Sequence, residues 1–429
     1  MNIASTPKER LYFLVANYFK FFADISLKRW RPQVVAITGS TGKTTLLELL
    51  DFQLGNTAHL SHNANSIYGI AFDILGLRGV SGSRLEWLKL FILAPLRAFS
   101  FTRQEAIYIV EIDAGRPNGA RVIANWLRPS ITALTGIEQS HAEFYEAAVK
   151  SGKYRTFIEA ISDEFMSIPR ATSELLIIPE GVDTIDRAIE QNLEFLPRRV
   201  LKLEEKSTLK SYEVSTEATK FTLSANRFSF SCPLPKEVWL QLAMMQSIVS
   251  ELGFNELKSD MTDLAFPPGR SSVLAGIKDS TLIDSSYNAQ LSSMLAILKM
   301  YKSIATKPKW LVIGDIIELG SREADQHVEL AKFLLDYPVD RLVLVGRRCQ
   351  KYMKSTLSDK RNVLFANDAH VALDFLQTNI HGGETILFKG SQHLEWIIAK
   401  LLANPASDMA KLPRQSPAEK TRLERLGYK

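Results

Sequence analysis

Residues 34–49, VVAITGSTGKTTLLEL, constrain the fold of this chain more than any other stretch. An apolar run from Val34 to Ile37 leads into a turn that contains Gly39 and Gly42, and an apolar helical pattern follows. This order predicts a strand, a phosphate-binding loop and a helix. The glycines let backbone N–H groups converge on phosphate oxygens, and the helix N-terminus adds partial positive charge. The stretch therefore predicts a nucleotide site.

The residues after the turn supply side chains for the same site. Lys43 is placed to reach the β- and γ-phosphates, and the Thr44 hydroxyl to hold Mg²⁺. The general pattern GxxxxGK[ST] would have glycine where this chain has Ile37. The variant TGxxGKTT resembles the ATP loop of the Mur ligase family, the ATP-dependent amide-forming enzymes of peptidoglycan synthesis. The resemblance implies ATP and Mg²⁺ as cofactors and the following nucleotide-binding residues: Gly39, Ser40, Thr41, Gly42, Lys43, Thr44 and Thr45.

Length and charge set further bounds. The 429 residues are enough for two or three domains. A net charge of +5 suits an anionic substrate or a membrane surface, but it is too weak to indicate nucleic acid. Cys232 and Cys349 show no metal-ligand spacing and favour a reducing compartment. We find no signal peptide and no run long enough to span a bilayer, so a cytoplasmic location is expected.

The N-terminal segment 1–33 is basic and aromatic, and it reads as a helix. Two interpretations stay open: a helix packed on the domain that follows, or a helix lying on an anionic membrane. A second apolar segment, 87–99, is either a core helix or a surface-seeking one. The apolar residues that recur at helical spacing in the first segment are Leu11, Leu14, Val15, Tyr18, Phe22 and Ile25.

Two α/β domains are expected. A central ATP-binding domain, 34–266, alternates strands with helices and predicts a mostly parallel sheet covered on both faces. In it, 141–161 reads as one helix and 219–231 as one strand. After a breaker cluster the alternation restarts, which predicts a Rossmann-like C-terminal domain, 267–405. The remainder, 406–429, is polar and is expected to be a mobile tail.

Further segments resemble, in order, the branch of the Mur ligase family that adds the terminal dipeptide, the MurF type. SHNANSIYG suggests substrate contacts for Asn63 and Asn65. In VEIDAG, Glu111 follows a buried strand, and the resemblance makes it a Mg²⁺ ligand. By the same resemblance His141 is a metal-site histidine, and Lys153 is the lysine whose carbamylated form bridges metal ions.

The match in this region is not complete. Lys150 is the rival of Lys153 for carbamylation. The chain has Gly136 where the family usually has Asn, and Arg155 where it has an acidic residue.

The second half of the chain extends the resemblance. Gln241 occupies the place where the family has an Asn that contacts the adenine base, so the resemblance implies adenine contact for Gln241. In PPGRSS and DSSYNA, Arg270 would reach the γ-phosphate, Asp284 the ribose, and Tyr287 and Asn288 the nucleotide or the closing interface. The segment VIGDIIELGSREADQH adds Glu318 and His327 for substrate orientation or domain closure. In LFKGS, Lys389 is expected either to pair with the carboxylate of the incoming amino acid or to be structural.

The resemblance implies a ligase that activates a carboxylate as an acyl phosphate and joins it to an amine. Lys43, His141, Lys153 and Arg270 would be its catalytic residues. The expected partners are a small-molecule or lipid-linked cell-wall precursor and an amino acid or D-Ala-D-Ala-type dipeptide. A monomer is expected, with peripheral membrane contact through the N-terminus left open. Because only 33 residues precede the ATP-binding domain in this sequence, we expect it to lack the family's N-terminal UDP-binding domain. Two alternatives remain: a related ligase acting on a carboxylate outside peptidoglycan, or a non-catalytic nucleotide-binding scaffold near the membrane.

Overall fold

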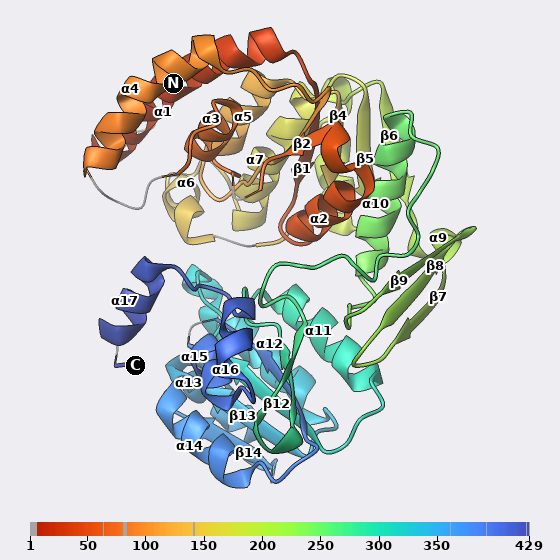
Figure 1. Cartoon of the computed structure of the whole chain (residues 1–429), viewed down its shortest axis with the longest axis vertical. Coiled ribbons are helices and arrows are strands. Elements are labelled where there is room, and N and C mark those ends of the chain that lie inside the picture. The colour runs from red at the N-terminus through yellow and green to blue at the C-terminus, as the bar shows by residue number, and fades with distance from the viewer. Residues whose placement is uncertain are drawn as a thin grey trace. The chain divides into compact units, whose positions relative to one another are not determined.

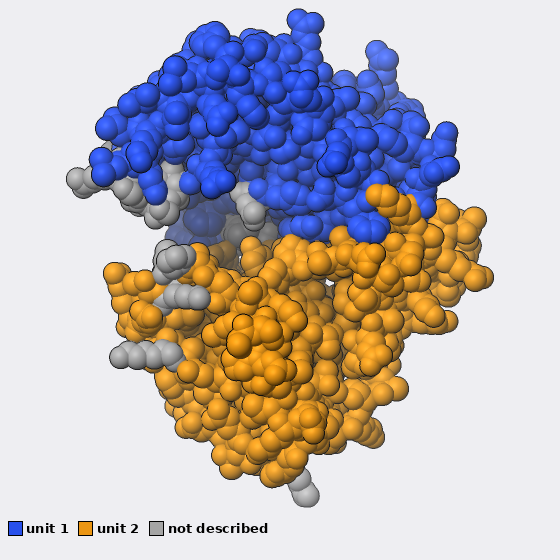
Figure 2. Space-filling model, viewed as in Figure 1, with its two compact units in different colours: residues 1–208, 240–257 blue, residues 209–239, 258–429 orange. Residues whose placement is uncertain are grey.

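The computed structural model describes residues 7–62, 64–79, 84–139, 142–360, 362–391, 393–425 and 427–428. The chain forms two compact units (Figures 1 and 2). Unit 1 comprises Met1–Thr208 and Leu240–Leu257, and unit 2 comprises Leu209–Trp239 and Lys258–Lys429. Within the described residues, none of the helices has both the length and the apolar character needed to cross a bilayer.

Unit 1 is built on a six-stranded parallel sheet in the order β2-β3-β1-β4-β5-β6. Ile37 of β1 pairs with Glu111 of β3 and Ala133 of β4, so these strands end at the same edge of the sheet. The expected mostly parallel sheet is confirmed. The strands are β1 (Gln33–Thr38), β2 (Ala58–Leu60), β3 (Ile107–Glu111), β4 (Ile131–Leu134), β5 (Leu175–Pro179) and β6 (Arg199–Leu203).

Helices cover this sheet and enclose its apolar strands in the core of unit 1. The α-helices are α1 (Pro7–Trp30), α2 (Lys43–Leu54), α3 (Ile67–Ile74), α4 (Arg84–Ser100), α5 (Gly119–Leu127), α6 (Glu146–Lys150), α7 (Phe157–Ala171), α8 (Asp183–Glu190), α9 (Glu205–Thr208) and α10 (Val238–Glu251). Short 3₁₀ turns lie at Gly55–Thr57, Ala142–Tyr145 and Leu193–Phe195.

The first helix packs on the core with most of the residues that its helical spacing marks, since Val15, Tyr18, Phe22 and Ile25 all contact the core of unit 1. Ala16, Phe19 and Ala23 of α1 are buried, and Phe19 contacts Phe72 of α3 with ring centroids 4.8 Å apart. Leu11 and Leu14 are exposed instead. The buried face of α1 thus combines two alanines with the large Phe19 ring.

Two predicted elements are broken in the structure. The helix expected over 141–161 stops after Lys150, because Gly152 takes a positive φ of 74° and Thr156 caps the separate helix α7. The strand expected over 219–231 is a hairpin that turns at Ser224, which has a φ of 50°. This hairpin belongs to a three-stranded antiparallel sheet: β7 (Leu209–Val214), β8 (Thr219–Leu223) and β9 (Asn226–Phe230).

Unit 2 contains that small sheet and a second six-stranded sheet in the order β10-β11-β15-β12-β13-β14. In this six-stranded sheet the edge strands β10 and β11 pair antiparallel, and the other neighbouring strands pair in parallel. The Rossmann-like alternation is therefore present, with an added antiparallel edge. The strands are β10 (Ser272–Ala275), β11 (Thr281–Asp284), β12 (Lys309–Gly314), β13 (Arg341–Val345), β14 (Val363–Ala366) and β15 (Thr385–Lys389).

The helices of unit 2 include the chain's last segment. Leu412 is buried in the core and the Tyr428 ring stacks on His370, so the tail that we expected to be mobile is packed on unit 2. The helices are α11 (Leu291–Ser303), α12 (Glu323–Leu335), α13 (Arg347–Leu357), α14 (Ala369–Asn379), α15 (Leu394–Leu401), α16 (Pro405–Asp408) and α17 (Pro417–Arg425), with 3₁₀ turns at Ile277–Asp279, Gly320–Arg322 and Met409–Lys411.

Candidate functional site

The turn between β1 and α2 has the geometry of a phosphate-binding loop. Gly39 has a φ of 128°, and a Cβ there would lie 2.3 Å from Thr135 Oγ1 and 2.8 Å from Gly136 N. Only glycine fits that position. The loop is held against the end of β4, since Ser40 N donates to Gly136 O at 2.9 Å and Thr135 Oγ1 donates to Thr38 O at 3.2 Å.

Gln241 of α10 lies directly on this loop. Gly42 has a φ of 80°, and a Cβ there would lie 2.4 Å from Gln241 Nε2. The Gln241 side chain is largely buried. The structure thus brings a buried amide from a distant helix to the phosphate loop. Reading of adenine by Gln241 stays a prediction.

Lys43 curls back over the loop. Its Nζ donates to Gly39 O at 2.7 Å and lies 3.5 Å from Asp113 Oδ1, and the side chain is mostly buried. Asp113 follows β3, so the ammonium is held between the loop and the adjacent strand end. A cation in this place neutralises phosphate charge beside the N-terminus of α2.

Thr44 and Glu111 form the oxygen pair expected of a Mg²⁺ site. Thr44 Oγ1 donates to Glu111 Oε2 at 3.2 Å, and Glu111 is 9% exposed. Ser61 Oγ accepts a hydrogen bond from Glu111 N at 3.1 Å and so fixes the backbone of the carboxylate. Hydroxyl and carboxylate oxygens are the hard donors that Mg²⁺ prefers, and a buried carboxylate favours a nearby cation. The donor set therefore fits the metal.

The other residues predicted for this side of the site are less closely placed. The Asn65 carbonyl accepts a 3.3 Å hydrogen bond from Asp113 N, so Asn65 lies beside the end of β3. Lys153 is exposed, with its Nζ 4.6 Å from the ring centroid of Tyr154. Among the described residues we find no contact between Lys153 and Thr44 or Glu111. The predictions for Asn63 and His141 lie outside the described residues.

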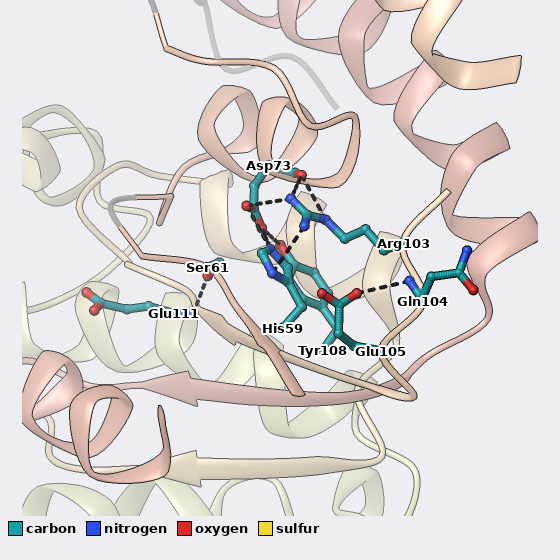
Figure 3. A network of polar contacts seen from close by, with 8 residues as sticks. All are labelled: His59, Ser61, Asp73, Arg103, Gln104, Glu105, Tyr108 and Glu111. Atoms are coloured by element: carbon teal, nitrogen blue, oxygen red, sulfur yellow. Dashed lines mark hydrogen bonds and ion pairs between the residues drawn. The ribbon is translucent and has the colours of Figure 1, made fainter. Parts of the chain in front are cut away.

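A partly buried polar network, which the sequence analysis missed, connects β2, β3 and α3 near the Glu111 site (Figure 3). Asp73 of α3 accepts hydrogen bonds from the Arg103 guanidinium and, at 2.9 Å, from Tyr108 Oη. His59 Nε2 lies 2.9 Å from Asp73 Oδ1, and Arg103 Nη1 lies 3.2 Å from His59 Nδ1.

The roles of the groups in this network follow from their surroundings. Because the Arg103 guanidinium has only donors, His59 Nδ1 is the acceptor and Nε2–H donates to Asp73. Burial, and then the Asp73 carboxylate, raise the pKa of Tyr108 well above its usual value, so the phenol remains a donor. Two residues after His59, Ser61 anchors Glu111, so the network holds the strand that positions this carboxylate.

A second cluster lies in unit 2, where β11 and β15 end side by side. Asp284 is fully buried; its Oδ1 accepts from Ser286 N at 2.9 Å, and its Oδ2 accepts no hydrogen bond from the described residues. Lys389 Nζ donates to Asn288 O at 2.6 Å. Burial raises the pKa of Asp284 to about 6 and lowers the pKa of Lys389 to about 7. Such displaced pKa values are typical of functional sites.

Tyr287 stands between two arginines in the same cluster. The Arg270 guanidinium lies 4.8 Å from its ring centroid and the Arg414 guanidinium 5.7 Å. Arg414 Nη2 also donates to Tyr287 O at 2.5 Å. The structure therefore brings together five residues that the sequence analysis singled out: Arg270, Asp284, Tyr287, Asn288 and Lys389. Their roles in binding stay predictions. Arg414 was missed because it lies in the segment read as a tail.

His327 and Glu318 lie near the end of β12. His327 is fully buried: Ile316 N donates to its Nε2 at 3.2 Å, and its Nδ1 lies 2.7 Å from Glu323 O. Burial lowers the pKa of His327, so the neutral ring accepts at one nitrogen and donates at the other. Asp315 and Cys349 lie close by, but this ring has no lone pair left for a metal. Glu318 has a φ of 64°, a conformation uncommon outside glycine and asparagine.

The chain is similar to several known proteins. The family model described as "Mur ligase, glutamate ligase domain" matches residues 269–392. The UDP-N-acetylmuramoyl-tripeptide–D-alanyl-D-alanine ligase of Rickettsia prowazekii is 24% identical over 391 residues, which cover 88% of this chain and 80% of that protein. The enzyme of the same name from Escherichia coli is 24% identical over 341 residues, covering 76% and 67%.

Solved structures show the same fold. A crystal structure of MurF from Acinetobacter baumannii matches 91% of this chain and 80% of its own, with a TM-score of 0.71 and 19% identity. MurF from Thermotoga maritima in complex with ADP matches 95% and 84%, with a TM-score of 0.69 and 19% identity.

Proposed function

Since the chain is a MurF-like Mur ligase, we propose that it joins an amino acid or a D-Ala-D-Ala-type dipeptide to a carboxylate of a cell-wall peptide precursor, at the expense of ATP. The observation that carries the proposal is the buried Thr44–Glu111 pair beside Lys43 on the phosphate loop. An ATP-dependent ligase needs a metal-bound triphosphate at such a place.

The reaction proceeds in two steps. The acceptor carboxylate attacks the γ-phosphate of ATP, which releases ADP and leaves an acyl phosphate. The amine then attacks the acyl carbonyl, a tetrahedral intermediate forms, and inorganic phosphate leaves as the amide bond closes. Catalysis of this kind depends on positioning and on neutralising charge on phosphate oxygens.

The residues of unit 1 divide this work. The loop N–H groups from Gly39 to Thr45 bind phosphate oxygens, and Lys43 supplies a positive charge to the β- and γ-phosphates. Thr44 and Glu111 hold Mg²⁺, which when bound neutralises the triphosphate. Gln241 contacts the nucleotide from α10. In this proposal His141 and a carbamylated Lys153 would be further metal ligands, and Asn63 and Asn65 would contact the substrate.

The residues of unit 2 serve nucleotide and substrate. Arg270 approaches the γ-phosphate, Asp284 the ribose, and Tyr287 and Asn288 the nucleotide. Lys389 pairs with the carboxylate of the incoming amino acid, and Glu318 and His327 orient that part of the unit. Support comes from the gathering of Arg270, Tyr287 and Asp284 at one end of the second sheet. We also propose that the enzyme acts as a monomer near the membrane.

The test is a substrate panel. The full chain is incubated with ATP and Mg²⁺, with muramoyl peptides, free and lipid-linked, as acceptors, and with amino acids and D-Ala-D-Ala as donors. Phosphate release is followed for each pair and the products are identified by mass spectrometry. The Lys43→Ala variant serves as the inactive control.

We expect phosphate release with one donor and acceptor pair, and a product heavier than the acceptor by the donor less one water. Release only with carboxylates outside this panel would assign a different substrate class. ATP binding without release from any pair would overturn the ligase and favour a nucleotide-binding scaffold.

A further inference from the structure

The outer faces of α1 and α4 carry most of the large apolar side chains that unit 1 exposes. In α4 they recur every three or four residues, so they line one face of the helix. In α1 they lie on the same face as Tyr18. Their exposed fractions run from 41% to 70% in the following set: Leu11, Leu14, Phe21, Leu85, Leu88, Ile92, Leu93, Leu96 and Phe99. We call this set the outer apolar face.

Because α1 and α4 contact each other, their exposed apolar residues form one surface. Tyr18 Oη donates to Phe91 O at 2.7 Å, and Arg29 Nη1 donates to Ala98 O at 2.8 Å. The contacts advance together along both helices, so α1 and α4 run side by side in the same direction (Figure 1). Both helices have a second, buried apolar side, where Phe19 and Leu90 join the core. The core therefore does not account for the apolar residues of the outer face.

The charged residues of α1 and α4 indicate which kind of partner the outer apolar face would bind. The segments 11–31 and 85–100, which cover most of α1 and α4, contain two acidic residues, Asp24 and Glu86. Asp24 forms an ion pair with Lys28 at 2.7 Å. Lys89 is exposed within the α4 stripe itself. The six cationic residues in these two ranges are Lys20, Lys28, Arg29, Arg31, Lys89 and Arg97.

We propose that the outer apolar face of α1 and α4 docks on the surface of an anionic membrane. An exposed apolar stripe of this size marks an interaction surface. Apolar side chains enter the boundary between headgroups and acyl chains, while lysines and arginines reach anionic headgroups. A second copy of the chain is a poorer occupant, because it would bring the exposed Lys89 of both copies into the contact. The docking is independent of the proposed ligase reaction.

The experiment is co-sedimentation of the full chain with two vesicle types. One is phosphatidylcholine alone and the other an equimolar mixture of phosphatidylcholine and phosphatidylglycerol. We expect binding to the mixed vesicles that weakens as salt is raised, and little binding to the neutral ones. No binding to either, or equal binding to both, would overturn the proposal.

A matched pair of variants places the binding on this face. Leu88→Gln with Ile92→Gln removes two outer residues that are each 58% exposed. Leu193→Gln with Phe195→Gln removes two residues of similar exposure, 65% and 61%, elsewhere on unit 1. We expect binding at least about tenfold weaker for the first variant and unchanged for the second.

Folding and self-association are checked in the same preparations. Circular dichroism and thermal unfolding should be alike for both variants and the wild type, since the changed side chains are exposed. Equal loss of vesicle binding in both variants would contradict the assignment. Sedimentation velocity supplies another decisive result: a wild-type dimer that the first variant alone dissociates would make the face a self-association surface and overturn membrane docking.

Discussion

Thr44 Oγ1 donates a hydrogen bond to Glu111 Oε2 at 3.2 Å, although the two residues are 67 positions apart in the chain. The parallel pairing of β1 with β3 brings them together at the carboxyl end of the sheet. One residue supplies a hydroxyl and the other a buried carboxylate, and both are adjacent to the phosphate loop.

Glu111→Gln tests the metal role of this pair. The amide oxygen can still accept from Thr44, so the fold should persist, but the negative charge is lost. We expect the apparent Mg²⁺ requirement for phosphate release to rise by about tenfold or more. Turnover measured against Mg²⁺ concentration checks this. Ser61→Ala is the control, since it keeps the carboxylate and removes only the acceptor of Glu111 N; it should shift the requirement less. An unaltered Mg²⁺ curve for Glu111→Gln would reject the assignment.

Lys43→Ala tests the phosphate contact. We expect ATP-dependent ligation to fall by about 100-fold or more, because the charge over the loop is removed. Phosphate release and nucleotide binding are both measured. Lys202→Ala removes an exposed lysine of unit 1 that lies 3.7 Å from Asp186, and should leave turnover unchanged. Turnover by Lys43→Ala at the wild-type rate would contradict the role given to this lysine.

Gly39→Ala and Gly152→Ala separate crowding from backbone strain. Both glycines have a positive φ, 128° and 74°, but a Cβ at position 39 would meet Thr135 and the Gly136 backbone, whereas a Cβ at position 152 would meet nothing within 4 Å. We expect Gly39→Ala to lower the free energy of unfolding by about 2 kcal/mol or more and to abolish nucleotide binding. Gly152→Ala should cost about 1 kcal/mol and leave binding intact. Denaturant unfolding and a nucleotide titration measure the two effects, and equal losses would show that crowding is not the cause.

Lys153→Ala tests carbamylation against its neighbour Lys150. If Lys153 carries the bridging carboxylate, its loss should reduce turnover by about 100-fold, and added short-chain carboxylic acids should restore part of it. Lys150 pairs with Glu146 at 2.8 Å on the surface, so Lys150→Ala should retain turnover. The reverse pattern would transfer the role to Lys150, and full turnover by both variants would remove it from this segment.

The buried Asp284 carboxyl predicts a pH effect on stability. Its pKa is raised from 3.8 to about 6, mainly by burial, so the folded state holds the proton more tightly than the unfolded state. The stabilising contribution is complete below the unfolded pKa and is lost as the pH rises through the folded one. Two pKa units correspond to about 3 kcal/mol. Between about pH 4 and about pH 7, the free energy of unfolding should fall more for the wild type than for Asp284→Asn. Parallel curves for the two proteins would contradict this.

The sequence by itself determined the local elements. The phosphate loop, the buried strands and most helices follow from glycine placement and apolar periodicity, which act between neighbours in the chain. Lys43 and Thr44 begin the helix after the loop and Glu111 ends a strand, as the sequence predicted. Parallel strands put their ligand-binding residues at the carboxyl edge. The two elements that the local pattern predicted wrongly, the helix over 141–161 and the strand over 219–231, are each interrupted by a residue with positive φ, Gly152 and Ser224.

Only the tertiary structure decided which distant residues meet. Contact between Gln241 and the loop, and between Arg414 and Tyr287, depends on how helices and the last segment pack, and no local pattern records that packing. The same holds for α1, where packing decides that Phe19 is buried against Phe72 of α3 while Leu11 and Leu14 remain exposed. Local sequence determines what each segment becomes, whereas burial shared between segments determines which of its side chains remain exposed.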